Sequence, residues 1–503
     1  MNLTRREFLR LAGLLGAGAA LSACSPIYAQ LSRQTQPFAG WEPTKLEPGN
    51  AHFGILNRLT FGPRPEERLH AAQIGLPAWI EEQLAPHSIE DTRCELLLRR
   101  FDTLRMSAAD LHDWSDKLFD AQDKTSVPAE LRQAAMIRQV YSHRQLYEVM
   151  VDFWSDHFNV SVEKGECWYL KTIDDRQVIR PHALGKFRDL LWASAHSPAM
   201  LVYLDNQSSS KGMPNENYAR ELMELHTLGV GSGYTQQDVM ELARCFTGWS
   251  VKEHFWRGEF FYDPARHDPG QKMVLGIVIA PAGQAEAEQI LDKLARHPST
   301  AHFIAAKLAR RFIADDPPSA AVSRASQAFL DSDGDIPSVL RALLLGEYAS
   351  PDSPAFRAKF KRPARFIVSA LRMLAAQTDG GAPIQEYLAR LGQPYFGWPT
   401  PDGYPDSSQA WLGNLMPRWQ FAYDLAANQL KGTRLDLEQI AAAGTRSPAG
   451  LLDFLSILLF GAPLPETRAQ ALLDALYKAG TSTSEMTPAL LASLLASPEF
   501  QWH

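Results

Sequence analysis

The sequence predicts a mainly α-helical protein, with a large multi-helix globular fold and a minor β-hairpin insertion. From Ala51 onward, apolar residues recur at helical spacings in most segments. The apolar content is 45%, as in an ordinary globular protein. Strand signals are few, and the best are residues 260–262 and 273–275. A turn containing Pro264 and Gly270 separates these two runs, so we expect them to pair with each other as a small hairpin.

The helical prediction is based on long amphipathic segments. Residues 131–158 are a good case, because Tyr147, Met150, Phe153 and Phe158 fall at helical spacings and form one apolar face. Residues 178–195 are expected to form a helix that opens near Arg180 and Pro181. Further helices are expected at 284–297, 300–314, 319–331, 336–347, 361–376, 408–427, 448–460, 465–478 and 487–498.

The first residues resemble an export signal. A paired arginine at positions 5 and 6 precedes Phe8, as in the twin-arginine consensus. The uncharged stretch 11–21 that follows is shorter than the roughly 20 apolar residues that span a bilayer. Residues 21–24 then resemble a lipobox, in which the thiol of Cys24 is acylated; a plain signal with an incidental cysteine is the alternative. We expect a lipoprotein that is exported folded and anchored to the membrane through lipid on Cys24, in the periplasm or at the cell surface.

The chain is expected to divide into three parts. Residues 1–23 would be a twin-arginine lipoprotein signal peptide, and residues 24–48, which are polar and contain proline, a lipidated tether. Residues 49–500 would form a single large α-helical domain. Its core motif region spans 150–270 and its C-terminal helical part 285–500.

Charge and cysteine content exclude several classes of protein. Loss of residues 1–23 removes three arginines and one glutamate, so the formal charge changes from -7 to about -9. An acidic exported protein lacks the basic surface that nucleic-acid binding needs. Apart from Cys24, only Cys94, Cys167 and Cys245 remain, and none has a metal-ligand spacing. At most one disulfide is expected, and Cys245 is expected to be a small core residue.

The candidate functional residues concentrate around the segment 215–226. Asn215 is a suitable N-cap for a helix, and Tyr218, Leu222 and Leu225 would form its apolar side. At 100° per residue, the opposite arc collects polar side chains, which are Glu216, Thr227, Arg220, Glu224, Asn217 and Glu221.

Two interpretations of this polar arc stay open. Glu221 and Glu224 could be an acid–base pair or the ligands of a divalent metal, with Arg220 binding an anionic group. Alternatively the arc is a solvated face or a structural Arg–Glu network. The arc lacks lysine and lies among aromatic segments, which favours burial and therefore function.

Neighbouring segments add further candidates. Asp152 and Asp156 share one helix face, and His157 follows them as a plausible metal ligand or proton carrier. Asp205 and Asn206 end an apolar helix before a Ser- and Gly-rich loop. The predicted catalytic set is Glu221, Glu224, Arg220 and His157; the predicted metal set is Glu221, Glu224, Asp156 and His157; the predicted substrate-binding set is Asp205, Asn206, Asn215, Glu216, Asn217 and Trp249.

Several motifs occur in the order found in one bacterial family. They are residues 57–63 (NRLTFGP), 157–159 (HFN), 180–185 (RPHALG), 203–206 (YLDN), 215–225, 247–249 (TGW) and 401–405 (PDGYP). From about residue 50 to 500 the chain therefore resembles the family catalogued as "domain of unknown function 1800". The resemblance implies an exported protein whose gene commonly lies beside that of a sulfatase- or alkaline-phosphatase-like protein. It brings no established reaction, and many relatives have Phe where this chain has His226.

Three functions follow as hypotheses. The first is an enzyme, with a metal-assisted hydrolase as the specific form considered, that hydrolyses or modifies a cell-envelope or extracellular polymer in an acidic cleft. The second is a non-catalytic lipoprotein that anchors or matures an exported sulfatase- or phosphatase-like partner. The third, a redox-cofactor protein, would explain folded export but has no ligand motif.

Overall fold

The computed structural model describes residues 28–503, except 29, 34–35, 40, 42–50, 117–124, 254–256, 346–358, 445–446 and 483–484. The predicted signal peptide 1–23 and Cys24 lie outside the described residues. No helix of the described part combines the length and apolar character needed to cross a membrane.

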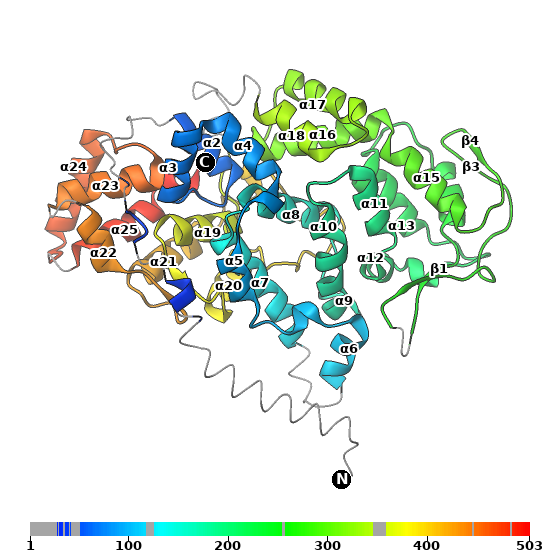
Figure 1. Ribbon diagram of the computed structural model, residues 1–503, viewed down its shortest axis with the longest axis horizontal. Coiled ribbons are helices and arrows are strands. Elements are labelled where there is room, and N and C mark those ends of the chain that lie inside the picture. The colour runs from blue at the N-terminus through cyan, green and yellow to red at the C-terminus, as the bar shows by residue number, and fades with distance from the viewer. Residues whose placement is uncertain are drawn as a thin grey trace, which may run out of the picture.

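The fold is mainly α-helical, as the periodicity predicts (Figure 1). The first half contains α2 (Ala51–Leu59), α3 (Pro65–Ile74), α4 (Leu76–Leu84), α5 (Thr92–Leu98), α6 (Ala108–Asp116), α7 (Ser126–Tyr141), α8 (Gln145–His157), α9 (Cys167–Asp174), α10 (Arg180–His182), α11 (Phe187–Ala195), α12 (Pro198–Tyr203), α13 (Glu216–Glu221) and α14 (Gln236–Cys245). The second half contains α15 (Ala285–Ala295), α16 (Pro298–Phe312), α17 (Ser319–Asp331), α18 (Ile336–Leu344), α19 (Pro363–Met373), α20 (Ala382–Arg390), α21 (Leu415–Ala426), α22 (Leu437–Ala443), α23 (Pro448–Phe460), α24 (Glu466–Lys478), α25 (Met486–Ala496) and α26 (Pro498–Gln501). Among the helices of the second half, α20, α22 and α26 lie outside the ranges that periodicity predicts, apart from the first residue of α26.

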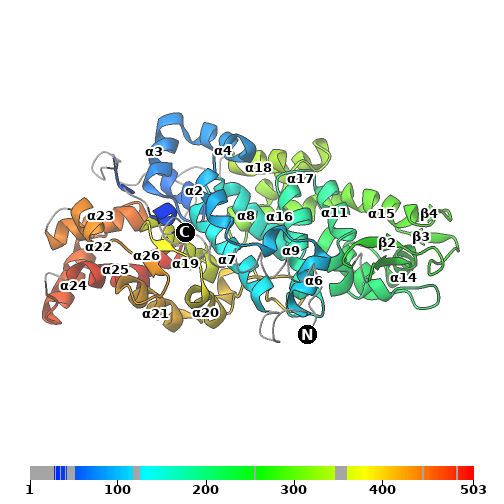
Figure 2. The same cartoon turned by 60° about the horizontal axis from the view of Figure 1, so that its bottom comes forward.

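The two ends of the described chain meet in one half of an elongated molecule. The first helices, α2 to α5, lie beside the last ones, α19 to α26, while α11 to α15 and the strand segments between residues 249 and 279 form the other half (Figures 1 and 2). Arg58 of α2 connects the two ends of the described chain, because its guanidinium donates to the carbonyls of Ile313 (2.8 Å) and His503 (2.6 Å). One continuous hydrophobic core runs from Trp41 to Phe500.

Two of the expected helices are broken. Residues 131–158 form α7 and α8, because Asp91 binds the connection through the hydroxyl of Ser142 (2.7 Å) and the backbone amide of His143 (2.9 Å). Residues 178–195 are divided into a π-helical turn (Asp175–Ile179), α10 and α11.

The expected strands exist, but the prediction that they pair with each other is wrong. The described residues contain three antiparallel pairs: β1 (Trp249–Val251) with β2 (Phe260–Tyr262), β3 (Lys272–Val274) with β4 (Ile277–Ile279), and β5 (Gln377–Thr378) with β6 (Thr433–Arg434). The reason is the turn after β3. Leu275 and Gly276 have φ values of 51° and 73°, the left-handed pair that closes a two-residue hairpin, so β3 turns back on β4.

The segment predicted as a tether contacts the folded body along part of its length. Trp41 is buried, and the rings of Phe38 and Trp41 pack edge-on against Phe454 of α23, with centroids 5.6 and 5.3 Å away. Cys94, Cys167 and Cys245 are each buried and unpaired, so Cys245 is a core residue as expected.

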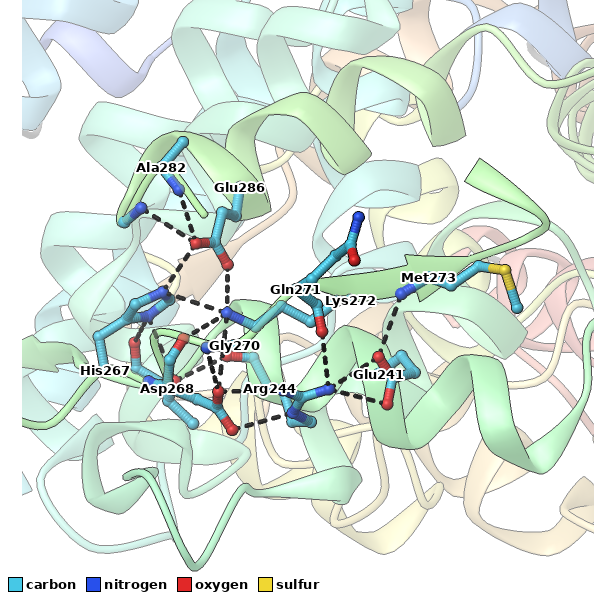
Figure 3. Close-up of polar contacts among 12 residues, drawn as sticks. Glu241, Arg244, His267, Asp268, Gly270, Gln271, Lys272, Met273, Ala282 and Glu286 are labelled. Atoms are coloured by element: carbon cyan, nitrogen blue, oxygen red, sulfur yellow. Dashed lines mark hydrogen bonds and ion pairs between the residues drawn. The ribbon is translucent and has the colours of Figure 1, made fainter. Parts of the chain in front are cut away.

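A buried polar network joins α14, β3 and α15 (Figure 3). Lys272 of β3 donates to Glu286 of α15 at 2.5 Å, and both side chains are fully shielded from solvent. The other carboxylate oxygen of Glu286 accepts from the backbone amides of Ala282 (2.8 Å) and Gly283 (3.1 Å) and lies 3.2 Å from Nε2 of His267. Because its groups satisfy one another, this network fixes how the strands sit on the helices.

We expect Lys272→Met to destabilise the protein by about 3–5 kcal/mol, because it leaves the Glu286 carboxylate buried without its cation. Urea denaturation of the purified protein measures this. The double variant Lys272→Met/Glu286→Gln should recover part of the loss. A loss below about 1 kcal/mol in the single variant would show that the ion pair is not a stabilising element.

Candidate functional site

The carboxyl end of α8 carries a row of polar side chains that bind distant parts of the chain. Asp152 pairs with Arg311 of α16, and Asp156, one turn later, accepts from Arg362 at 2.6 Å. The prediction that these two aspartates share a face of one helix is therefore consistent with their contacts. All four side chains are mostly buried, and they fix α16 and the segment before α19 against α8.

A loop after α20, residues 398–406, lies against the same end of α8. Asn159 donates to the carbonyls of Trp398 (3.0 Å) and Thr400 (2.7 Å). Gly403 has a φ of 73°, and a Cβ there would lie 2.0 Å from the carbonyl oxygen of Asp156. Only glycine allows this approach, because other residues would add both a clash and backbone strain.

A cavity of about 250 Å³ lies between this loop, α8 and α16. From α16, it is lined by Phe303, Lys307 and Arg310, which follow one another at i, i+4 and i+7 and so occupy one stripe of the helix. The remaining lining residues are Phe153, Asp156, His157, Arg362, Asp402, Gly403, Tyr404, Pro405 and Asp406. Arg310 and Asp402 are exposed, so they mark the side of the cavity that opens to solvent. The volume is slightly below the ~300–1,000 Å³ range of small-molecule sites.

Lys307 and His157 form a hydrogen-bonded pair in this cavity. Nζ of Lys307 lies 2.9 Å from Nδ1 of His157. Because an ammonium group only donates, Nδ1 accepts, so Nε2 carries the hydrogen and donates to the carbonyl of His226 at 3.1 Å. Burial holds the pKa of His157 well below its ordinary value, and the nearby Lys307 lowers it further.

The cavity contains an amine and a carboxyl whose pKa values are shifted toward neutrality. Burial lowers the pKa of Lys307 to about 8, although Asp156 and Asp406 oppose this shift. Burial raises the pKa of Asp156 to about 6, although Arg362 beside it acts in the other direction. Asp406 differs: burial alone would raise its pKa, but Lys359, 3.3 Å away, and Arg311 outweigh burial and lower it. Several groups with pKa values shifted in different directions around one cavity are typical of acid–base sites.

Most of the polar arc predicted on α13 lies on the surface, away from the cavity lining. Arg220 forms ion pairs with Glu216 (3.5 Å) and Glu224 (3.9 Å), and Gln236 of α14 contacts both Arg220 (2.9 Å) and Glu216 (2.7 Å). The side chains of Arg220, Glu216 and Glu224 are 37%, 42% and 25% exposed, so the contribution of these pairs to stability is small, about 0–1 kcal/mol. The geometry fits the Arg–Glu network that was the non-catalytic alternative.

A π-helical turn, Leu222–Thr227, changes the helical phase within this segment. Thr227, which a uniform 100° spacing places on the polar arc, is fully buried, and its hydroxyl donates to the carbonyl of Leu222 at 2.6 Å. Glu221 is only partly buried. Burial raises its pKa, with Glu224 and, less strongly, Asp402 adding to the shift and Arg220 opposing it.

The asparagines predicted to bind substrate hold the backbone. Asn215 caps α13, because its side-chain oxygen accepts from the amides of Asn217 (2.8 Å) and Tyr218 (3.4 Å). Its amide group donates to the carbonyl of Leu204 (3.1 Å), as does that of Asn217 (3.4 Å). Asn206 is buried and contacts the carbonyls of Phe246 and Trp249 at 3.4 and 3.3 Å.

The other predicted residues also lie apart from the cavity lining. Asp205 has a φ of 61° and pairs at the surface with Lys164, 2.8 Å away. Trp249 is completely buried against His196, Phe246 and Phe260, so a substrate cannot reach it in this conformation.

The four predicted metal ligands do not converge. Among the described residues, no three His, Cys, Asp or Glu side chains form a group that could hold a metal ion. Asp156 and His157 line one cavity, but both ring nitrogens of His157 are engaged, and Glu221 and Glu224 are not among the lining residues.

Sequence reasoning missed the partners of Asp156 and His157. Lys307 lies within one predicted helix and Arg362 near the start of another, neither in a recognisable motif, and only the fold brings them to α8. A signal for the loop was present, since residues 401–405 form one of the ordered motifs and include the glycine that touches Asp156.

The comparisons with known proteins establish the family. Residues 54–502 match the model of the family described as "Protein of unknown function (DUF1800)", so the chain belongs to this family. No curated protein matches, and no solved structure matches.

We expect Gly403→Ala to destabilise the protein by more than about 2 kcal/mol, because the new Cβ would clash with the Asp156 carbonyl at a strained φ. Urea denaturation tests this. Gly413→Ala is the matched control, since nothing lies within 4 Å of its Cβ position. Equal stabilities of the two variants would contradict the close approach.

Lys307 should react with an amine-reactive ester with a midpoint near pH 8, because burial lowers its pKa to about 8. Pulse labelling from pH 6 to 10, read by peptide mass spectrometry, measures the profile. Lys211 and Lys293, both exposed, are the internal references. A Lys307 profile identical to theirs would refute the shift.

Proposed function

We propose that this protein is an exported enzyme, lipid-anchored through Cys24, that cleaves a cell-envelope polymer by acid–base chemistry in the cavity between α8 and α16. The observation that carries the proposal is one cavity that holds both a carboxyl with a pKa of about 6 and an amine with a pKa of about 8. The sequence features at residues 1–24 support export and anchoring.

The two shifted groups suit opposite roles. Between pH 6 and 8, Asp156 is mostly ionised and Lys307 mostly protonated. The Asp156 carboxylate is then a stronger base than an ordinary aspartate, and the Lys307 ammonium a stronger acid than an ordinary lysine. Asp156 would take a proton from the attacking water, and Lys307 would give one to the leaving oxygen of the cleaved bond, so the products are two free ends and no net proton is consumed.

Neighbouring side chains would position this pair. His157 accepts from one Lys307 N–H, and among the described residues this is the only hydrogen bond that Lys307 donates. Its remaining N–H groups are therefore available to a ligand. Arg362 holds one oxygen of Asp156 at 2.6 Å, which leaves the second oxygen for water.

The test is to incubate the purified lipoprotein with envelope material and profile the released products by mass spectrometry. We expect release to be highest between about pH 6 and 8, falling on the acidic side as Asp156 is protonated and on the basic side as Lys307 is deprotonated. Lys307→Met and Asp156→Asn should each reduce release about 100-fold or more.

Controls separate chemistry from folding. Lys307→Met removes a buried charge and should leave the unfolding midpoint unchanged or higher, and Lys293→Met, on α15, should not affect release. Unchanged release in a folded Lys307→Met variant would sink the proposal. If the double variant Glu221→Gln/Glu224→Gln lost product release while Lys307→Met remained fully active, the active site would instead lie on α13.

One surface favours the second hypothesis, a lipoprotein that binds an exported sulfatase- or phosphatase-like partner. Along and just before α21, large apolar side chains are solvent-exposed: Leu412, Leu415, Met416, Trp419 and Tyr423. Exposed apolar patches of this kind often mark protein contacts. A purely partner-binding protein would release no products from the envelope, whatever the state of Lys307.

A further inference from the structure

The charges around the cavity are not all paired. Asp156 is bound by Arg362, and Asp406 by Lys359 and Arg311. By contrast, Arg310 has no carboxylate within ion-pair distance among the described residues; its Nε donates to the backbone carbonyl of Asp315 at 3.2 Å.

Lys307 is the second cation without a carboxylate partner. Among the described residues, its single hydrogen bond is to the neutral imidazole of His157, and its Nζ lies 5.5 Å from the ring centre of Phe303. Lys307 and Arg310 are three residues apart on one stripe of α16, so two cations that have no carboxylate at ion-pair distance among the described residues face the same space.

One carboxylate at the opening is also without a cation. Asp402 is exposed, and its Oδ1 accepts from Nε1 of Trp398 (2.9 Å) and the hydroxyl of Thr400 (2.5 Å). These contacts orient the carboxylate and leave Oδ2 free, among the described residues, to accept hydrogen bonds from a ligand.

The unpaired groups of the cavity indicate which chemical groups a matching ligand would carry. The two cations would bind a negatively charged group of a ligand, and the free carboxylate oxygen of Asp402 would accept hydrogen bonds from its hydroxyls. The rings of Phe153, Phe303 and Tyr404 provide apolar surfaces for the ligand to pack against. A space of about 250 Å³ fits one sugar ring with its substituents better than a length of polymer.

We infer that the cavity binds a single sugar residue that carries a negatively charged group, with the charge at Arg310 and hydroxyls at Asp402. This inference rests on the proposed function and specifies its substrate class: the end of an acidic polysaccharide. Lys307 then contributes to binding through its charge and to cleavage through its proton, whereas Arg310 contributes to binding alone.

Calorimetry with the full-length lipoprotein tests this with three trisaccharides: trigalacturonate, its neutral methyl ester, and a sulfated galactose trisaccharide. We expect at least one charged ligand to bind about tenfold or more tightly than the neutral ester. A hydrogen bond to a charged group contributes at least this factor to binding affinity. Arg310→Gln should remove most of the preference, while Lys293→Gln, an exposed cation on α15, should keep it. The preference should also weaken as salt is raised.

The outcomes are distinguishable. Binding of the carboxylated or only of the sulfated ligand supports the inference and identifies the charged group. Equal binding of charged and neutral sugars, a preference that survives in Arg310→Gln, or no binding at all overturns it. If envelope cleavage still depends on Lys307 and Asp156 in that case, the proposed function stands without this substrate class; if cleavage does not, both fail.

Once a cleaved substrate is known, kinetics provide a second measurement. Arg310→Gln should raise KM about tenfold and leave kcat within about twofold, because a group that binds ground state and transition state equally affects KM alone. An equal fall of kcat and kcat/KM would contradict a binding role for Arg310.

Discussion

The approach of Gly403 to the carbonyl of Asp156 is the contact on which the arrangement of the cavity depends. The segment 398–406 reaches α8 across more than 240 residues of sequence, and it can do so only because position 403 has no side chain. Once the loop is seated, Asn159 holds it through two backbone carbonyls, and Asp402, Tyr404 and Asp406 line the cavity. A side chain at position 403 would displace the loop and open the cavity.

The ion pairs of α8 hold α16 and the segment before α19 in place, just as the close approach at Gly403 holds the loop 398–406 in place. Asp152 and Asp156 each bind an arginine from a different part of the chain, so one helix face sets the position of two walls. Buried ion pairs add little net stability compared with well-packed apolar groups, but they are costly to break. They therefore fix a specific geometry, and here that geometry leaves Lys307 with a single neutral partner. The same burial that requires the pairs shifts the pKa values of Asp156 and Lys307 toward neutrality.

The predicted centre on α13 shows why a helical wheel is weak evidence for a site. The wheel correctly grouped Glu216, Arg220 and Glu224, which interact with one another. It could not tell a surface network from a buried one, because that depends on what covers the face. It also assumed 100° per residue through Leu222–Thr227, where the backbone forms a π turn and buries Thr227. The absence of lysine from the arc favours burial, but Gln236 from α14 forms hydrogen bonds with the arc at the surface instead.

The sequence by itself determined the helical class, most helix positions, the positions of two strands, β2 and β3, and the shared helix face of Asp152 and Asp156. These features are local: they follow from side-chain periodicity and turn chemistry within a few residues. Only the tertiary structure decided the strand partners, the surface position of the α13 network and the cavity that joins α8, α16 and the loop 398–406. Lys307 carries no local signal, because its lowered pKa depends on burial and its hydrogen bond is to His157, 150 residues away. The pKa of a lysine falls to about 8 only where the fold limits its contact with water and places no carboxylate at ion-pair distance, and the residues beside Lys307 in the sequence show neither condition.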